Sequence, residues 1–353
     1  MVFILSEEQL DFQDVLLKPR PSKLKSRKDV CLSKRYSDRE GLTIARGIPI
    51  MNANMSTVGN FAVARAMLND GMFATIHKHY QPKEIVEFMK SIGDDQARRV
   101  FISIGIRDQF MNYEKLKAIR EQLKTEGFYP GQICIDVPNA YLEVVLDLVK
   151  RVRAESPSAL IMAGNVCSPD GVTDLAEAGA HIIKVGVGSS PACRTRFVAG
   201  VGRPQLSAII ACAESAKDHN CVICSDGGIS QPADVVKAIA AGAEFVMCGS
   251  FYAGTEEAEG EFVEYRGEKC KVYYGMASET AQNLFYGGVD DYKTSEGALL
   301  YVNYQGYVHD QNLKIMGGLR SACTYLNAEN LSELAQNAIF YKVRRQHTIK
   351  GDK

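Results

Sequence analysis

The chain has 353 residues, which exceeds the usual size of one hydrophobic core but is a length that a single α/β barrel routinely fills. Its 46% apolar and 24% charged residues exclude wholesale disorder. Because 41 basic residues nearly balance 42 acidic ones, we expect no nucleic-acid partner and no attraction to anionic membranes. The longest apolar runs, such as Ala208–Ala213, are too short to span a bilayer, and Met1–Leu10 lacks the basic start of a secretory signal, so we expect a cytoplasmic protein.

After a polar lead-in over 1–47, short apolar runs alternate with segments of helical periodicity up to residue 250. The apolar runs predict strands over Ile48–Met51, Met72–Ile76, Val100–Ile104, Ile133–Val137, Leu160–Ala163, Ile182–Val185, Cys221–Cys224 and Phe245–Cys248. The periodic segments predict helices over Phe61–Leu68, Pro82–Ile92, Asn112–Glu126, Ala140–Glu155, Gly171–Ala178, Pro204–Ala216 and Ala233–Ala240. Strands that are apolar on both faces and separated by helices are expected to be parallel and buried. A doubly wound sheet fits this pattern, but eight strands favour an α/β fold with a closed (β/α)8 TIM barrel, which we expect to form a single domain over 1–353.

Residues 251–353 form a tail beyond the eighth predicted strand. Within it, Glu261–Tyr274 alternates in polarity around Arg266-Gly267, which predicts a small β-hairpin excursion. Residues 276–320 are rich in Gly, Tyr, Asn and Asp and poor in periodicity, so we expect an irregular flap over the site there.

Ten cysteines are scattered singly through apolar segments, which is typical of a reducing compartment rather than of a disulfide framework. Cys221 and Cys224 form a C-x-x-C pattern, but their spacing on a strand points the two thiols to opposite faces. The pattern therefore predicts two buried cysteines rather than a metal site.

The active site of such a barrel lies at the carboxyl ends of the strands, so the residues that follow each strand are the candidates. Asp226-Gly227-Gly228 follows the seventh predicted strand, and Gly249-Ser250 follows the eighth. Glycines there leave backbone N–H groups close to a phosphate, which predicts a phosphate-bearing ligand. Asp226 would accept hydrogen bonds from sugar hydroxyls, or it would cap the next helix.

A glycine-rich turn, Gly186-Val187-Gly188, follows the sixth predicted strand and leads to Cys193. The basic residues Arg194 and Arg196 flank this cysteine, and cationic neighbours favour the thiolate, the nucleophilic form of a cysteine. A loop cysteine can also be inert. Its place beside the predicted phosphate site favours the nucleophile.

His77-Lys78-His79 follows the second predicted strand. Two histidines at this spacing suggest a metal site, but no third ligand stands at a useful distance along the chain. Lys78 better suits the charge or the leaving group of a ligand. Asp136 after the fourth strand and Asn54 after the first add polar groups to the rim, although such residues also serve as loop caps.

These segments, in this order, resemble the IMP dehydrogenase/GMP reductase family over nearly the whole chain. The matching pieces are Asp11–Leu17, Asn54–Val58, Ala163–Val166, Cys193–Arg196, Gly202–Gln205, Ser225–Gly228, Tyr274–Met276, Ser295–Gly297 and Gly317–Ser321. His77–Tyr80 and Cys134–Val137 are similar to the reductase members. The dehydrogenase members activate water with an arginine–tyrosine pair in the flap, whereas Gly288–Ser295 contains no arginine. The resemblance therefore implies NADPH-dependent reductive deamination of GMP to IMP and ammonia, through a thioimidate on Cys193.

The resemblance also implies a role for individual residues. It assigns catalysis to Cys193, Thr195, Glu296 and Lys78, with Thr195 and Glu296 supplying the proton for the departing amine. It assigns the nucleotide to Asp226, Gly227, Gly228, Gly249, Ser250, Gly275, Met276, Ala277, Lys293 and Gly297. It assigns the cofactor to Ser26, Arg27, His79, Asp136, Val137, Pro138, Val187, Gly188, Tyr292, Ser321, Ala322, Cys323 and Thr324. It implies a homotetramer, and a monovalent cation (K⁺) held around Gly186, Gly188, Cys193 and Arg196.

The chain departs from the family pattern at the catalytic loop, which usually reads G-x-G-P-G-S-x-C-T-T-R. Here Ser189, Ser190, Pro191 and Arg194 stand in place of Pro, Gly, Ser and Thr. Two enzymatic alternatives therefore stay open, namely IMP oxidation with NAD by a dehydrogenase without a regulatory module, and reduction of another purine nucleotide. A catalytically silent nucleotide-binding barrel is a third, but it would have no need to retain Cys193, Thr195 and Glu296 together.

Overall fold

The protein is described by a computed structural model that covers residues 4, 7–37, 43–107, 111–288 and 294–344. Eight parallel strands form one sheet in the order β4-β11-β10-β9-β8-β7-β6-β5. Their bounds are β4 Ile50–Asn52, β5 Ala74–Ile76, β6 Val100–Ile104, β7 Gln132–Asp136, β8 Ile161–Val166, β9 Ile182–Val185, β10 Val222–Asp226 and β11 Phe245–Cys248. The sheet closes into a barrel because the Phe73 amide donates to the Ile50 carbonyl at 3.1 Å and Ile48 bridges to Met72.

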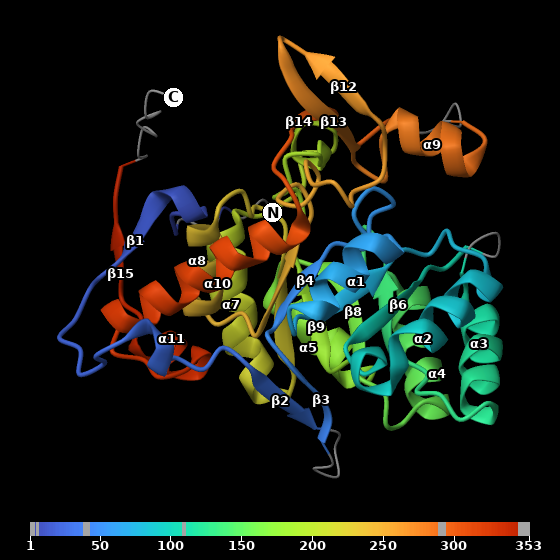
Figure 1. The fold of residues 1–353 in the computed structure, drawn as a ribbon, viewed down its shortest axis with the longest axis horizontal. Helices are drawn as coiled ribbons and strands as arrows, with labels where there is room; N and C mark the ends of the chain where they lie inside the picture. Colours follow the sequence, from blue (N-terminus) through green and yellow to red (C-terminus); the bar gives the residue numbers. More distant parts are fainter. Residues whose placement is uncertain (1–3, 5–6, 38–42, 108–110, 289–293, 345–353) are drawn as a thin grey trace.

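Helices connect these strands and cover the outside of the barrel (Figure 1). They are α1 Phe61–Asn69, α2 Pro82–Ala97, α3 Tyr113–Thr125, α4 Glu143–Glu155, α5 Pro169–Glu177, α7 Gln205–Asp218, α8 Pro232–Ala240 and α10 Val308–Tyr325. The (β/α)8 barrel predicted from the sequence is thus confirmed. Proline stands in the first turn of α2, α5 and α8, where its missing N–H would have no helical partner in any case.

Most residues of the barrel strands are buried and apolar. Strands β6 and β9 are buried over their whole length, as expected for parallel strands covered on both faces. Cys221 and Cys224 are both buried and free, so the prediction of two buried thiols is confirmed. Lys184 on β9 is a charged residue in this interior, with a side chain only 1% exposed.

The hairpin after the eighth strand is confirmed, and it is part of a three-stranded sheet. Strands β12 Phe262–Tyr265 and β13 Glu268–Tyr274 pair around Arg266 and Gly267, whose positive φ angles of 56° and 77° suit a tight two-residue turn. Strand β14 Leu299–Asn303 adds to β13. Figure 1 shows this sheet standing above the barrel, next to α9 (Glu279–Tyr286).

The expectation of an irregular stretch over 276–320 is wrong for much of its length. The segment contains α9, β14 and most of α10. Helix α10 packs against α8 and α1 and so completes the ring of barrel helices. The adjacent Gly317 and Gly318 interrupt its apolar pattern, and their low helix propensity hid the helix from a periodicity argument.

A segment near the start of the described chain pairs with one near its end, at one side of the molecule. Strand β1 (Val15–Leu17) pairs with β15 (Phe340–Lys342), near the short helix α11 (Leu331–Asn337). A hairpin of β2 (Lys34–Ser37) and β3 (Thr43–Gly47) covers the amino end of the barrel, where the Tyr36 ring contacts Phe245. None of the helices in the described ranges is both long and apolar enough to cross a membrane.

Candidate active site

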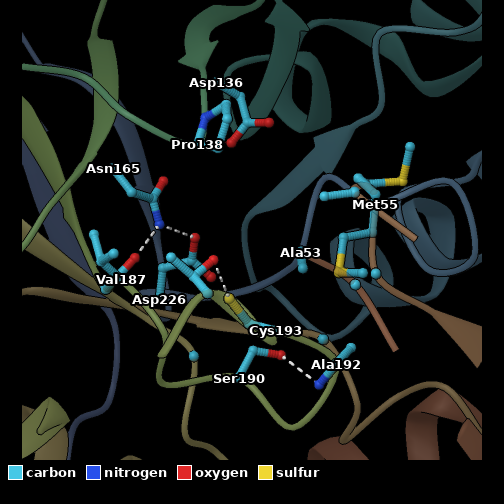
Figure 2. A pocket seen from close by; sticks show the side chains of 18 of the residues that line it. Ala53, Met55, Asp136, Pro138, Asn165, Val187, Ser190, Ala192, Cys193 and Asp226 are labelled. Carbon is cyan, nitrogen blue, oxygen red and sulfur yellow. Dashed lines mark hydrogen bonds between the residues drawn. The ribbon is translucent and has the colours of Figure 1, made fainter. Parts of the chain in front are cut away.

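A cavity of about 420 Å³ opens at the carboxyl ends of the barrel strands. Residues that end or follow all eight strands line it, from Ala53 after β4 to Gly249 after β11. The flap residues Gly275–Ala277 and Glu296–Gly297 close one side. Figure 2 shows Cys193 and Asp226 in the middle of the cavity, with Asp136 and Pro138 at its far side. The site therefore lies where the barrel geometry predicts it.

Cys193 stands at the start of a chain of polar contacts. Its Sγ lies 3.2 Å from Thr195 Oγ1, and this hydroxyl donates to Glu296 Oε2 at 2.7 Å. Thr195 opens the short helix α6 (Thr195–Val198), which turns its hydroxyl back toward the sulfur. Sulfur, hydroxyl and carboxylate thus form a continuous path along which a proton can move.

Backbone contacts bind the Cys193 loop to the flap. The Arg194 amide donates to the Glu296 carbonyl at 2.7 Å, and Cys193 forms an antiparallel bridge with Gly297. The Glu296 amide donates to the Ala277 carbonyl at 3.1 Å. The position of Glu296 is therefore fixed by its main chain, independently of its carboxylate.

The predicted nucleotide-binding glycines gather on one side of the cavity. The lining residues from that prediction are Asp226, Gly227, Gly228, Gly249, Ser250, Gly275, Met276, Ala277 and Gly297. Gly227 has a φ angle of 102°, and a Cβ there would lie 2.5 Å from Ser189 Oγ, so only glycine fits this turn. Lys293 and the rest of the predicted flap sequence over 289–293 lie outside the described residues.

Asp226 faces the cavity and does not cap a helix. Helix α8 is capped at Gln231, whose backbone N–H donates to Asp234. Asn165 Nδ2 donates to Asp226 Oδ2 at 2.9 Å, and Lys184 Nζ lies 3.2 Å from the same oxygen. No group in the described part of the chain donates to Oδ1, which leaves that oxygen available to a ligand hydroxyl.

Asp136 lies between two lysines at the other end of the cavity. Lys184 Nζ pairs with its Oδ1, and Lys78 Nζ lies 3.8 Å from its Oδ2. Burial alone would raise the pKa of Asp136, but the charges of Lys184 and Lys78 outweigh it and lower the pKa to about 2. Asp136 is therefore a carboxylate throughout the physiological range.

The two histidines after β5 have separate environments. Burial lowers the pKa of His77 to about 3, and its ring stacks on Tyr80 with 4.1 Å between centroids. Burial and the charge of Lys78 lower the pKa of His79 to about 4, and its ring stacks on Phe285 of α9. The described residues contain no group of three His, Cys, Asp or Glu side chains that could hold a metal.

The predicted cofactor residues fall into two groups. Asp136, Val137, Pro138, Val187 and Gly188 line the cavity, and His79 lies behind it against α9. Ser26 and Arg27, on the η2 turn, pack against α10, which carries Ser321–Thr324, and none of these residues lines the cavity. Within that second group the Cys323 side chain is fully buried. Tyr292 lies outside the described residues.

The residues predicted to hold a monovalent cation surround one turn of the Cys193 loop. The Gly186 carbonyl already accepts from Asn165 Nδ2 at 2.9 Å. The Arg196 side chain packs over Gly188, where an added Cβ would lie 2.6 Å from Arg196 Cγ. Gln205 Oε1 is buried beside Gly186 and has no hydrogen-bond partner within the described ranges.

Sequence reasoning missed several cavity residues, among them Lys184, Arg107 and Tyr286. Lys184 interrupts the apolar strand Ile182–Val185, and a lysine in a strand buried on both faces is a signal in itself. Arg107 follows the third barrel strand and would have been found by examining that strand's end. Tyr286 lies on α9, a helix that the periodicity did not predict.

Comparison with known proteins agrees with this geometry. A family model described as the IMP dehydrogenase / GMP reductase domain matches residues 9–351. The chain is 43% identical to GMP reductase of Caenorhabditis elegans over 97% of this chain and 94% of the relative. It is 45% identical to GMP reductase 1 of Homo sapiens, over 96% of each chain. It is 41% identical to GMP reductase of Edwardsiella ictaluri (strain 93-146), over 96% of this chain and 95% of the relative. The resemblance inferred from the motifs is confirmed, and the chain belongs to the IMP dehydrogenase/GMP reductase family.

Proposed function

We propose that this chain reduces GMP to IMP and ammonia with NADPH, through a covalent bond between Cys193 and the purine. The observation that carries the proposal is the contact path from the Cys193 sulfur over Thr195 to the Glu296 carboxylate at the cavity wall. A barrel that only binds nucleotide needs none of these groups. The relatives named GMP reductase, at 41%, 43% and 45% identity, favour reduction of GMP over oxidation of IMP.

In the first half-reaction the Cys193 sulfur bonds to C2 of GMP, and the bond from C2 to the exocyclic nitrogen breaks. The nitrogen leaves with the bonding electrons and takes up one proton to become ammonia, while the thiol gives up one proton. Thr195 Oγ1 lies 3.2 Å from the sulfur and 2.7 Å from Glu296 Oε2, so the proton can pass to the carboxylate and return to the amine. Glu296 is the proton store of this step.

In the second half-reaction C2 gains hydride, and the electron pair of the C–S bond returns to Cys193, which releases IMP. NADPH, when bound, supplies this hydride. The cavity fits such a cofactor because it extends past Asp136 to Arg107 and Tyr286. The Arg107 guanidinium carbon lies 5.0 Å from the Tyr286 ring centroid, and no described carboxylate pairs with it, so this cation is available to a phosphate.

The second group of predicted cofactor residues would reach the same cofactor only from a neighbouring copy, so we propose the homotetramer implied by the family. The group on η2 and α10 lies outside the cavity of its own chain. Phe197, four residues after Cys193, is 84% exposed, and Val198 and Val201 near it are 40% and 55% exposed, so the apolar residues of this segment support a contact with another subunit. Light scattering of the purified protein tests the assembly, and a monomer with full activity would contradict it.

We propose further that a monovalent cation, K⁺, binds the backbone carbonyls of Gly186, Gly188 and Cys193 next to Arg196. The unpartnered Gln205 Oε1 beside Gly186 supports an acceptor-rich position here. Replacing K⁺ by tetramethylammonium should slow turnover, because the larger ion cannot enter a ring of carbonyls. An unchanged rate would contradict the site.

The proposed reaction is tested by supplying each purine nucleotide with each cofactor and identifying the products. GMP with NADPH should give IMP, ammonia and NADP⁺. Turnover only with IMP and NAD⁺ would establish the dehydrogenase alternative. Turnover only with a different purine nucleotide and NADPH would establish a reductase of other specificity, which the altered Ser189–Pro191 loop makes a necessary comparison.

A further inference from the structure

The ammonium group of Lys184 joins the two ends of the cavity. Its Nζ pairs with Asp136 Oδ1, lies 3.2 Å from Asp226 Oδ2 and donates to Asn54 Oδ1 at 3.3 Å. An ammonium group has three protons, and here each has one acceptor. Asp136 and Asp226 end strands β7 and β10, and Asn54 follows β4, so one side chain connects three separate parts of the barrel rim.

The backbone beside Lys184 is closely packed, and acidic groups offset the burial of its charge. Gly164 lies on the neighbouring strand β8, and a Cβ there would lie 2.6 Å from the Lys184 carbonyl oxygen. Burial would lower the pKa of Lys184, but Asp136 and Asp226 outweigh it and raise the pKa well above its usual value. Two carboxylates and an amide oxygen surround Nζ, so the position accommodates the ammonium form and uses its protons in these contacts.

A buried ion pair is a weak source of stability, because removing two charges from water offsets most of their attraction. The side chains of Asp136 and Asp226 remain 25% and 21% exposed and face the cavity, whereas that of Lys184 is 1% exposed. The two carboxylates thus face the cavity, while the ammonium group that pairs with both of them is buried behind them. This points to a role in the site rather than in the fold.

We propose that Lys184 is a positioning residue whose buried ammonium group fixes the carboxylates of Asp136 and Asp226 relative to each other, and thereby aligns the cofactor end of the cavity with its nucleotide end. This inference rests on the proposed function, which identifies the two ligands as GMP and NADPH. Because its side chain is only 1% exposed, Lys184 would act through the two aspartates rather than by direct contact with a ligand. Asp136 in turn holds Lys78, whose Nζ donates to the Asp136 carbonyl at 3.3 Å.

The titration of Asp136 reports on this role. Besides Lys184, the groups that face Asp136 are Lys78 and His79 after β5, Asp226 on β10, Cys134 on its own strand and Tyr286 on α9. Lys184 and Lys78 are the cations among them. Without Lys184, one cation and a burial that favours the neutral acid remain, so the carboxyl should protonate at a higher pH.

The test compares Lys184→Met, Lys184→Gln and Lys184→Arg with the matched control Lys271→Met. Lys271 is also a buried lysine, but its ammonium group donates to backbone carbonyls of Glu256 and Ala258, away from the cavity. The readouts are the pH profile of kcat and the affinity for NADPH from nicotinamide fluorescence, both between pH 4 and 8, a range that lies above the wild-type pKa of Asp136 of about 2. Lys184→Gln keeps two donors and carries the test if Lys184→Met does not fold.

Loss of the charge should lower kcat by about 10²-fold. Burial then outweighs the one remaining cation, so the pKa of Asp136 should rise by roughly two to three units, and both profiles should show an acid limb at higher pH than in the wild type. Lys184→Arg should restore most of kcat, and Lys271→Met should leave both profiles unchanged. If the profiles of the neutral variants match the wild type down to pH 4, or if Lys184→Arg is as defective as Lys184→Met, Lys184 is structural and the proposal is overturned. The binding profile needs no turnover, so a wild type that fails to oxidise NADPH with GMP refutes the proposed reaction separately.

Discussion

Replacing Glu296 by glutamine separates the two half-reactions. The substitution keeps the size of the side chain and an oxygen that accepts from Thr195, but it removes the group that stores the proton. The backbone contacts of Glu296 with Arg194 and Ala277 involve no carboxylate, so the flap should stay in place. A positioned acid–base group contributes about 10²–10⁴-fold to the step it serves. This corresponds to roughly 3–5 kcal/mol in the barrier of deamination.

The assay follows NADPH absorbance with GMP and with a 2-halogenated purine nucleotide. Halide departs without a proton. The turnover rate of Glu296→Gln should therefore fall by about 10²-fold or more with GMP and should fall little with the halogenated nucleotide. Thr195 lies between Cys193 and Glu296 in the proton path, so the variants Thr195→Ser and Thr195→Val control for the need for a hydroxyl there. Serine keeps the hydroxyl that lies 3.2 Å from Cys193 Sγ and should remain active, whereas valine should behave like Glu296→Gln.

Equal loss with both substrates would refute this reasoning. It would mean that Glu296 serves flap closure or nucleotide binding, and that the proton of the departing amine comes from another group.

Three further predictions follow from the same geometry. Cys193→Ser should still bind GMP but lose turnover almost completely, because a hydroxyl is a far poorer nucleophile than a thiol, and substantial residual turnover would make the cysteine structural. Arg107→Gln should weaken NADPH binding by about tenfold and leave GMP binding unchanged, since a charge-assisted contact to phosphate is worth about 1.5 kcal/mol. As a control measured by the same calorimetry, Arg98→Gln removes a similar arginine that lies 4.3 Å from the Tyr129 ring, and it should change neither affinity. His77 is held neutral by burial, with its pKa lowered to about 3, so its contribution to stability is complete above the unfolded pKa of about 6.5 and is lost as the pH falls toward 3. At pH 5 this loss is roughly 2 kcal/mol, and thermal unfolding of His77→Phe should show a correspondingly flatter decline between pH 7 and 5, whereas equal slopes would contradict the assignment.

Much of the barrel could be predicted because buried parallel strands have a distinct signature. Strands β6, β9 and β11 match the prediction to the residue, since each is a short run in which apolar residues dominate. Helix α10 escaped because two adjacent glycines interrupt it and packing against α8 and α1 stabilises it instead. Intrinsic propensity alone carries no information about such tertiary contacts.

The candidate site shows the same division between local and tertiary information. Cys193, Asp226 and Asp136 were found because the ends of barrel strands converge, whatever the loops do between them. The role of Glu296 came only from the family resemblance, because no local rule brings a residue 101 positions beyond Thr195 into hydrogen-bond contact with it. Lys184 was missed because a strand pattern predicts which positions are buried, but it does not predict the hydrogen-bond acceptors that other strands supply to a buried charge.

The covalent state of Cys193 tests the central claim most directly. Enzyme quenched during turnover of GMP with limiting NADPH is digested, and the peptide that carries Cys193 is weighed by mass spectrometry. The account predicts that this peptide gains the mass of GMP less one ammonia, and that the gain is absent in Cys193→Ser. Steady oxidation of NADPH and formation of IMP without any adduct on Cys193, in an enzyme that stays active as Cys193→Ser, would contradict it.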